Sequence, residues 1–192
     1  MKNAKAFVVS FMILFLLLPA RAKEIFLEPY VGVGQMVLAV YDSTHQDFDV
    51  KDIANGFMVG CKGGINFNQR FFAGLDYQTA GPFTFGRMMS KAEMTVNMLG
   101  VGAGLDYDIS RFWAGYYFNQ TIRDSANSIA YTGEAAKVGF GLKVTKNLHA
   151  NIEVIFHNIY TRDTSSASSF NLNRTLRAQS AFASVSLPVD FR

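Results

Sequence analysis

The sequence contains one cysteine, Cys61, so an internal disulfide is excluded and other interactions must stabilise the fold. After residue 22 it lacks any apolar run near the roughly 20 residues of a membrane-spanning helix, so a membrane role must be carried by strands. It also lacks sustained helical periodicity, and no linker or low-complexity segment divides it. These absences favour a single domain built from β-strands.

The first 22 residues have the pattern of a secretory signal peptide. Lys2 and Lys5 precede the apolar segment Ala6–Leu18, and small residues follow it at positions 20 and 22. The apolar segment has 13 residues, which is too short for a spanning helix. We therefore expect residues 1–22 to be cleaved and residues 23–192 to form the mature domain.

The charge of this expected mature chain is balanced. The formal net charge of +3 derives from three basic residues in the first 22, and the remaining chain has 15 basic and 15 acidic residues. Binding to nucleic acid usually requires a basic patch or an excess of positive charge. We therefore expect no nucleic-acid partner.

The mature sequence alternates apolar and polar residues with period two, which predicts strands. Their connections alternate between tight turns and long loops, a pattern typical of up-and-down membrane barrels. The prediction is an all-β fold, an eight-stranded antiparallel up-and-down transmembrane β-barrel. The predicted strands are 25–41, 57–67, 71–78, 97–105, 112–119, 136–144, 148–157 and 180–191, with tight turns at 66–70, 106–111 and 144–148 and long loops at 42–55, 79–92, 123–135 and 162–175.

One face of the predicted strands is rich in glycine. In 97–105, Gly100, Gly102 and Gly104 have the spacing G-x-G-x-G, and a further strand follows instead of the helix that a dinucleotide-binding loop requires. Eight strands enclose an interior just wide enough for side chains, so small residues are needed where others are long. The glycine face is therefore predicted to line a narrow lumen. Its other glycines are Gly32, Gly34, Gly60, Gly64, Gly74, Gly115, Gly139 and Gly141.

Charged residues fall on the same predicted inner face. Acids and bases there are nearly balanced, whereas the outer face is almost free of charge, as expected beside lipid. The predicted lumen charge network consists of Glu28, Lys62, Asp76, Asp106, Lys137, Lys143 and Glu153. Asn119 is assigned to the inner face of its strand. Aromatic residues near the short turns predict an interfacial girdle of Phe67, Phe71, Phe72, Tyr107, Phe112, Trp113 and Phe191.

These features resemble the small bacterial outer-membrane β-barrel proteins of the OmpA transmembrane domain, OmpX and OmpW type. The resemblance covers the mature chain and rests on "EPYVGVG", on strand pairs such as "GVGAGLDYDISRFWAGYYF" and on the closing "SVSLPVDFR". It implies a location in the bacterial outer membrane and assembly by the barrel assembly machinery. That machinery is thought to read a closing aromatic segment, which Val185, Leu187, Val189 and Phe191 match, although Arg192 displaces the aromatic residue by one position.

The function expected from the resemblance is a non-enzymatic outer-membrane protein whose loops serve structural, lipopolysaccharide-contact or adhesion roles. Cations in or beside the long loops are candidate lipopolysaccharide contacts, because the arginine fork matches phosphate oxygens. These cations are Arg87, Lys91, Arg123, Arg162, Arg174 and Arg177. One alternative is a narrow OmpW-like route for small apolar molecules, and no cofactor is expected for either function.

A second alternative is a lipid A-modifying hydrolase. His157 is the candidate base, and the loop serines are candidate nucleophiles. The deacylase pattern of His and Ser two residues apart is not matched, however, and the favoured interpretation of His157 is a lumen histidine held by neighbours such as Glu153. The loop serines are Ser165, Ser166, Ser168 and Ser169.

Two loops carry further candidate sites. The acidic residues Asp42, Asp47, Asp49 and Asp52 gather in the first long loop, but the loop lacks the glycine and terminal glutamate of a calcium site, so we expect no metal. The second long loop contains Phe83, Phe85, Met88, Met89 and Met94, which suit either a partner or lipid contact or packing over the barrel mouth.

Overall fold

The computed structural model describes residues 22–42, 47–67, 70–85, 92–164, 169–171 and 176–191. All of the predicted leader except residue 22 lies outside these ranges. No helix in the described part is long and apolar enough to cross a membrane. The strands are β1 (Ala22–Asp42), β2 (Asp47–Phe67), β3 (Phe71–Phe85), β4 (Ala92–Asp106), β5 (Ser110–Asp124), β6 (Ile129–Thr145), β7 (Leu148–Thr164), β8 (Ser169–Asn171), β9 (Leu176–Ser186) and β10 (Val189–Phe191).

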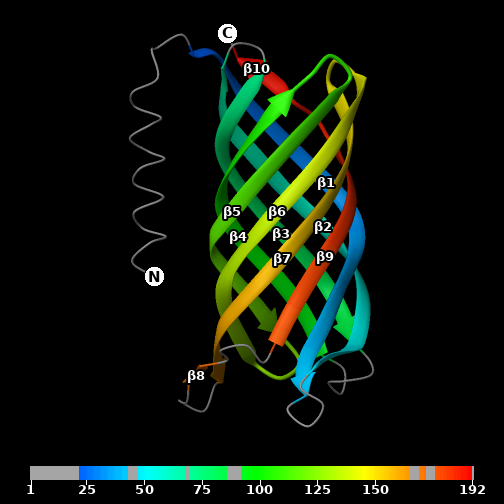
Figure 1. Cartoon of the computed structure of the whole chain (residues 1–192), viewed down its shortest axis with the longest axis vertical. Coiled ribbons are helices and arrows are strands. Elements are labelled where there is room, and N and C mark those ends of the chain that lie inside the picture. Colours follow the sequence, from blue (N-terminus) through cyan, green and yellow to red (C-terminus); the bar gives the residue numbers. More distant parts are fainter. Residues whose placement is uncertain are drawn as a thin grey trace.

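The strands close into one antiparallel barrel (Figure 1). Consecutive strands pair from β1 to β7, and β9 pairs with both β7 and β1. The barrel wall thus has eight strands, and the predicted fold class is confirmed. The short β8 pairs with the end of β7, and β10 continues the last strand along β1 after Leu187 and Pro188.

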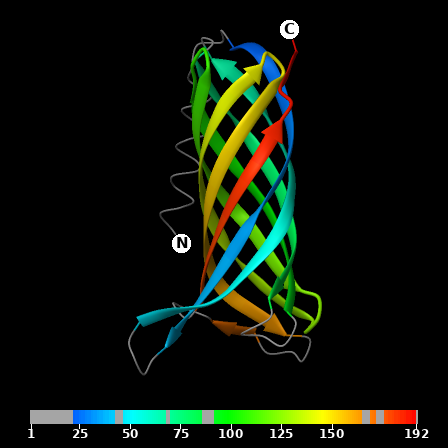
Figure 2. The same cartoon turned by 90° about the vertical axis from the view of Figure 1, so that its right-hand side faces the viewer.

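The two ends of the barrel differ. The short turns at 107–109 and 146–147 lie at one end together with β10, and we call this the short-turn end (Figure 1). At the opposite, long-loop end, β1 and β2 continue past the other strands (Figure 2). Several predicted loops are shorter than expected, because β2 already begins at residue 47 and the 123–135 connection reduces to a turn at 125–128.

The strands are longer than predicted because the apolar side of the wall changes along most of them. Near the short-turn end, apolar residues point outward and polar residues or glycines point into the lumen. Towards the long-loop end the interior becomes apolar and the outward residues become mostly polar, although β1 and β2 keep the outward apolar residues Val37 and Ile53. In β4 the inward residues there are Met94, Val96 and Met98, all buried, and the outward ones are Glu93, Thr95 and Asn97.

A ring of outward polar residues marks the reversal, and we call it the collar. Each of the eight wall strands contributes one residue, and all of these residues are exposed or half-buried. The pairs Gln35–Asn55, Thr79–Asn97 and Glu134–Asn158 are cross-strand partners, and the remaining steps are staggered in one direction, as expected for a level ring on tilted strands. The collar consists of Gln35, Asn55, Thr79, Asn97, Asn119, Glu134, Asn158 and Gln179.

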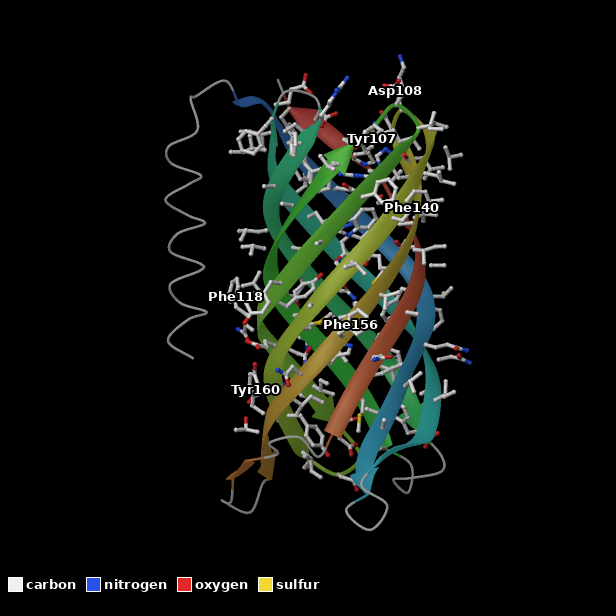
Figure 3. The ribbon with its side chains drawn as sticks, in the orientation of Figure 1. Tyr107, Asp108, Phe118, Phe140, Phe156 and Tyr160 are labelled. Atoms are coloured by element: carbon white, nitrogen blue, oxygen red, sulfur yellow. The ribbon has the colours of Figure 1, made fainter. Side chains whose placement is uncertain are left out.

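The outward side chains between the collar and the short-turn end form an apolar band. On β1 they run from Ile25 to Val33 and end at Gln35, about the number of residues with which a tilted strand crosses a bilayer. Figure 3 shows Tyr107 and Phe140 near the short-turn end, with Phe118 and Phe156 further along the wall.

Three sequence assignments near this band are wrong. Phe72 and Trp113 are not girdle residues, because both point into the lumen, where they form a buried cluster with Phe26. Asn119 faces outward, because the β4–β5 register shifts between Leu99 and Gly100 and leaves Phe118 and Asn119 both exposed. By contrast, Phe71, Tyr107, Phe112 and Phe191 have exposed rings close to the short turns.

We expect the long-loop end to face the cell exterior, because barrels of this type have short periplasmic turns. In a Cys61→Ser background, Ala126→Cys lies in the exposed turn at one end and Lys146→Cys in the exposed turn at the other. A membrane-impermeant maleimide should label the first variant on intact cells and the second only after permeabilisation. The reverse labelling would contradict this orientation.

Candidate functional site: the lumen

The centre of the lumen holds a buried network of two lysines and two acids. Lys137 Nζ lies 2.6 Å from Asp76 Oδ2 and 3.2 Å from Glu153 Oε2, and Lys62 Nζ lies 3.2 Å from Glu153 Oε1. These residues come from β2, β3, β6 and β7, so the network connects opposite sides of the wall. All four are buried, and each charge therefore depends on its partners for compensation.

Aromatic residues complete the contacts of this network. The hydroxyls of Tyr30 and Tyr117 donate to Asp76 at 2.7 and 2.8 Å. Lys62 Nζ lies 4.0 Å from the centre of the Trp113 ring and 4.8 Å from that of Tyr30. Cations above aromatic faces gain a further favourable interaction where water is excluded.

The glycines on the inner face provide room for these rings. A Cβ at Gly139 would lie 2.2 Å from Trp113, and one at Gly60 would lie 2.3 Å from Tyr30. A Cβ at Gly104 would likewise come within 2.5 Å of the Phe72 ring. Larger residues at these positions would require the rings to move, which explains why this face is rich in glycine.

A second charged group lies nearer the short-turn end. Arg111 Nη1 donates to Glu28 Oε2 at 2.5 Å and contacts His149 Nδ1 at 3.2 Å. Sequence reasoning missed Arg111 because it was placed in the turn, although it lies two residues before the inward Trp113 and thus on the same face. Asp106 and Lys143 form an ion pair with each other further out, where both side chains are about one quarter exposed.

These outer pairs line an open vestibule with a volume of about 370 Å³. Its lining includes Phe26, Glu28, Arg111, His149 and Asp190. Asp106 and Lys143 therefore sit at the mouth of the barrel, separate from the buried network. The seven predicted lumen charges thus divide into a buried group and a vestibule group, with Arg111 added to the latter.

Among the described residues, one apolar cluster of twenty buried residues extends from Tyr30 and Tyr117 at the centre through the long-loop half of the lumen. Met36, Met58, Phe83, Phe85 and Met94 are at most 1% exposed. The part of the second predicted loop that is described therefore packs inside the barrel, whereas Met88 and Met89 lie outside the described residues.

His157 lies within this half and has different partners from those expected. Its Nδ1 lies 2.7 Å from Gln120 Oε1 and its Nε2 lies 2.8 Å from Ser180 Oγ. Glu153, the neighbour suggested by the sequence, is bonded to lysines instead. Ser180 and Gln120 are buried, so this serine–histidine contact is enclosed by the cluster.

The remaining predicted site residues are only partly described. Among the rim cations, Arg123 is exposed on β5, the side chains of Arg162 and Arg177 are outside the description, and Arg87, Lys91 and Arg174 fall outside the described ranges. The loop serines and the first three acidic residues of the first loop likewise have no described side chains, and Asp52 is buried. No group of three metal-ligating residues occurs among the described residues.

The proposed assembly segment lies on the outer face of the barrel. Val185, Leu187, Val189 and Phe191 are each about half exposed. They form one outward apolar row along β9 and β10 beside β1. Recognition of this row by the assembly machinery stays a prediction.

The chain belongs to the outer membrane protein beta-barrel domain family, because the model of that family matches residues 8–177. The protein is thus a β-barrel of the bacterial outer membrane. A search of curated proteins gives no match.

Solved structures share the architecture. AlkL, an outer membrane protein determined in lipid bilayers, is 10% identical with a TM-score of 0.51, and the match covers 90% of this chain and 93% of AlkL. Ail of Yersinia pestis, in complex with the heparin analogue sucrose octasulfate, is 8% identical with a TM-score of 0.51 over 85% of this chain and 99% of Ail. Neisserial surface protein A is 15% identical with a TM-score of 0.48, covering 83% and 96%. At these identities the likeness concerns the fold alone.

Removal of Lys137 should destabilise the barrel strongly, because Asp76 and Glu153 would keep buried charges with fewer partners. We expect Lys137→Met to lower the free energy of unfolding by about 3–5 kcal/mol. Lys143→Met, at the exposed mouth, is the matched control and should cost about 1 kcal/mol or less. Urea unfolding in lipid vesicles, followed by the fluorescence of the single tryptophan, measures both values. Equal losses in the two variants would contradict this account of the network.

Proposed function

We propose that the protein is a closed, non-enzymatic outer-membrane protein that displays its long-loop end at the cell surface, where it contacts lipopolysaccharide or a surface partner. The observation that carries this proposal is the double closure of the lumen. The network of Lys62, Lys137 and their acidic partners fills the centre, and the apolar cluster fills the long-loop half of the lumen. A barrel filled in this way is suited to holding loops in place and unsuited to passing solutes.

A second candidate is a narrow route for small apolar molecules. This candidate is supported by the side chains in the long-loop half of the lumen, which include Met36, Met58, Met94 and Met98. Methionine side chains are flexible and adapt to apolar ligands. Passage would require these buried side chains to move aside.

Purified protein in planar bilayers should show no stable conductance of the size of a porin, because described side chains fill the centre and the long-loop half of the lumen. In vesicles whose outer leaflet is lipopolysaccharide, which slows apolar solutes, a small apolar dye should enter as slowly with the protein as without it. A stable large conductance would overturn the closed barrel, and faster dye transfer would favour the second candidate.

The absence of enzymatic activity is supported by the position of His157. Its serine partner is buried, and Gln120 occupies the place that a carboxylate would take in a catalytic triad. We expect the mass spectrum of lipid A to be the same in cells with and without the protein. If lipid A lost an acyl chain in cells with the protein but kept it in cells carrying His157→Ala, the protein would instead be a lipid A hydrolase.

Lipopolysaccharide contact at the rim is supported by the number of cations near the long loops. Guanidinium groups can form paired hydrogen bonds with phosphate oxygens. The variant Arg87→Gln/Arg174→Gln/Arg177→Gln should co-purify with less lipopolysaccharide than the wild type. If a folded triple variant retained the same amount, these residues would be ordinary solvated loop charges.

A further inference from the structure

An outward polar cluster lies on β5, β6 and β7 at the level of the collar. The Tyr116 hydroxyl donates to the Glu134 carboxylate. Asn158 Nδ2 donates to Tyr160 Oη at 3.1 Å. Glu134 is the one charged residue in the eight-residue collar, all of which is described. We call these four residues the Glu134 cluster; Figure 3 shows Tyr160 on the wall towards the long-loop end.

The wall around the Glu134 cluster is ordered by polarity along the barrel axis. On the membrane side, the rings of Phe118 and Phe156 are both 46% exposed. On the other side Thr121 pairs with Thr132, whose hydroxyl contacts that of Thr161. Two residues beyond Thr121 comes the exposed Arg123. From the membrane side towards the long-loop end, the wall therefore presents apolar rings, then a carboxylate and an amide, then hydroxyls, and finally a guanidinium.

We propose that this wall binds one lipopolysaccharide molecule, with the sugar–acyl junction of its lipid A at the Glu134 cluster. The acyl chains lie against Phe118 and Phe156, and amide N–H and hydroxyl groups of the glucosamine units donate to Glu134 and Asn158. A phosphate of the disaccharide then reaches Arg123. The inference rests on the proposed contact with lipopolysaccharide and adds a site on the wall, separate from Arg87, Arg174 and Arg177.

The carboxylate selects between the lipids that reach this level. A diacyl phospholipid carries its phosphate beside the acyl junction, so its negative charge would lie next to Glu134 and be repelled. Lipid A carries hydrogen-bond donors at its acyl junction and its phosphates at the ends of the disaccharide. The arrangement of carboxylate and guanidinium on the wall matches that separation.

The test compares two cross-strand pairs of the collar. Glu134→Leu/Asn158→Leu removes the polar pair on β6–β7, and Gln35→Leu/Asn55→Leu removes the corresponding pair on β1–β2. Native mass spectrometry of protein purified in mild detergent counts the retained lipopolysaccharide, and electrophoresis without heating checks that the barrel is folded. We expect the β6–β7 variant to retain at least about fivefold less than the wild type, because it loses two acceptors and each hydrogen bond contributes about fivefold, and the β1–β2 variant to match the wild type.

A conservative variant guards against a folding defect. Tyr116→Phe/Tyr160→Phe keeps both rings and removes the hydroxyls that contact Glu134 and Asn158, so it should also retain less lipopolysaccharide. Equal retention in all variants would overturn the site, and so would equal loss in both collar pairs, which would reflect general polarity of the collar. A dimer of the wild type that disappears in the β6–β7 variant, with retention unchanged, would identify the surface as an interface between copies.

The same measurement separates this inference from the proposed function. If the wild type retains no more lipopolysaccharide than phosphatidylglycerol, the proposed contact itself fails. If Arg87→Gln/Arg174→Gln/Arg177→Gln loses lipopolysaccharide while the β6–β7 variant does not, the contact stands and only the wall site is wrong.

Discussion

The structure depends on the change of surroundings along the outer wall, from lipid to water, at the collar. Between the short-turn end and the collar the wall faces hydrocarbon, so apolar side chains point outward and polar groups are confined to the lumen. Past the collar we infer that the wall faces water, where burial of apolar surface again favours an apolar interior. The inward Val96 and Met98 next to the outward Asn97 show this change within three consecutive residues of β4.

The composition of the lumen follows from that constraint. In the membrane-embedded half the interior is narrow and polar, so charges there must compensate one another, as Lys137 does with Asp76 and Glu153. Glycines such as Gly139 leave space for rings such as Trp113 to lie across the interior. In the other half, Phe83 and Phe85 pack as in the core of a water-soluble protein. The centre and the long-loop half are filled by different interactions, and the short-turn end opens into the vestibule.

Much of the fold could be predicted from the sequence, because period two persists over most of each strand and the charges of the buried network follow from their parity. Arg111 could have been assigned by the same rule from Trp113. The ends of the strands could not be predicted. Past the collar the apolar residues point inward and the polar ones outward, and such a segment resembles a polar loop when the outer face is assumed to be apolar. The outward position of Asn119 depends on a register shift, and the partners of His157 depend on how β5, β7 and β9 are staggered. Neither is visible in one strand alone.

The central claim is that the wall leaves the membrane at the collar, and its most direct test is the depth of spin labels along β4. Labels at Val101, Leu99, Thr95 and Glu93, one at a time, face outward on either side of Asn97. In reconstituted protein, collisions with oxygen should dominate at Val101 and Leu99, and collisions with a water-soluble nickel complex should dominate at Thr95 and Glu93. Oxygen-dominated spectra at all four positions would contradict the claim, since they would place the long-loop half of the barrel in lipid.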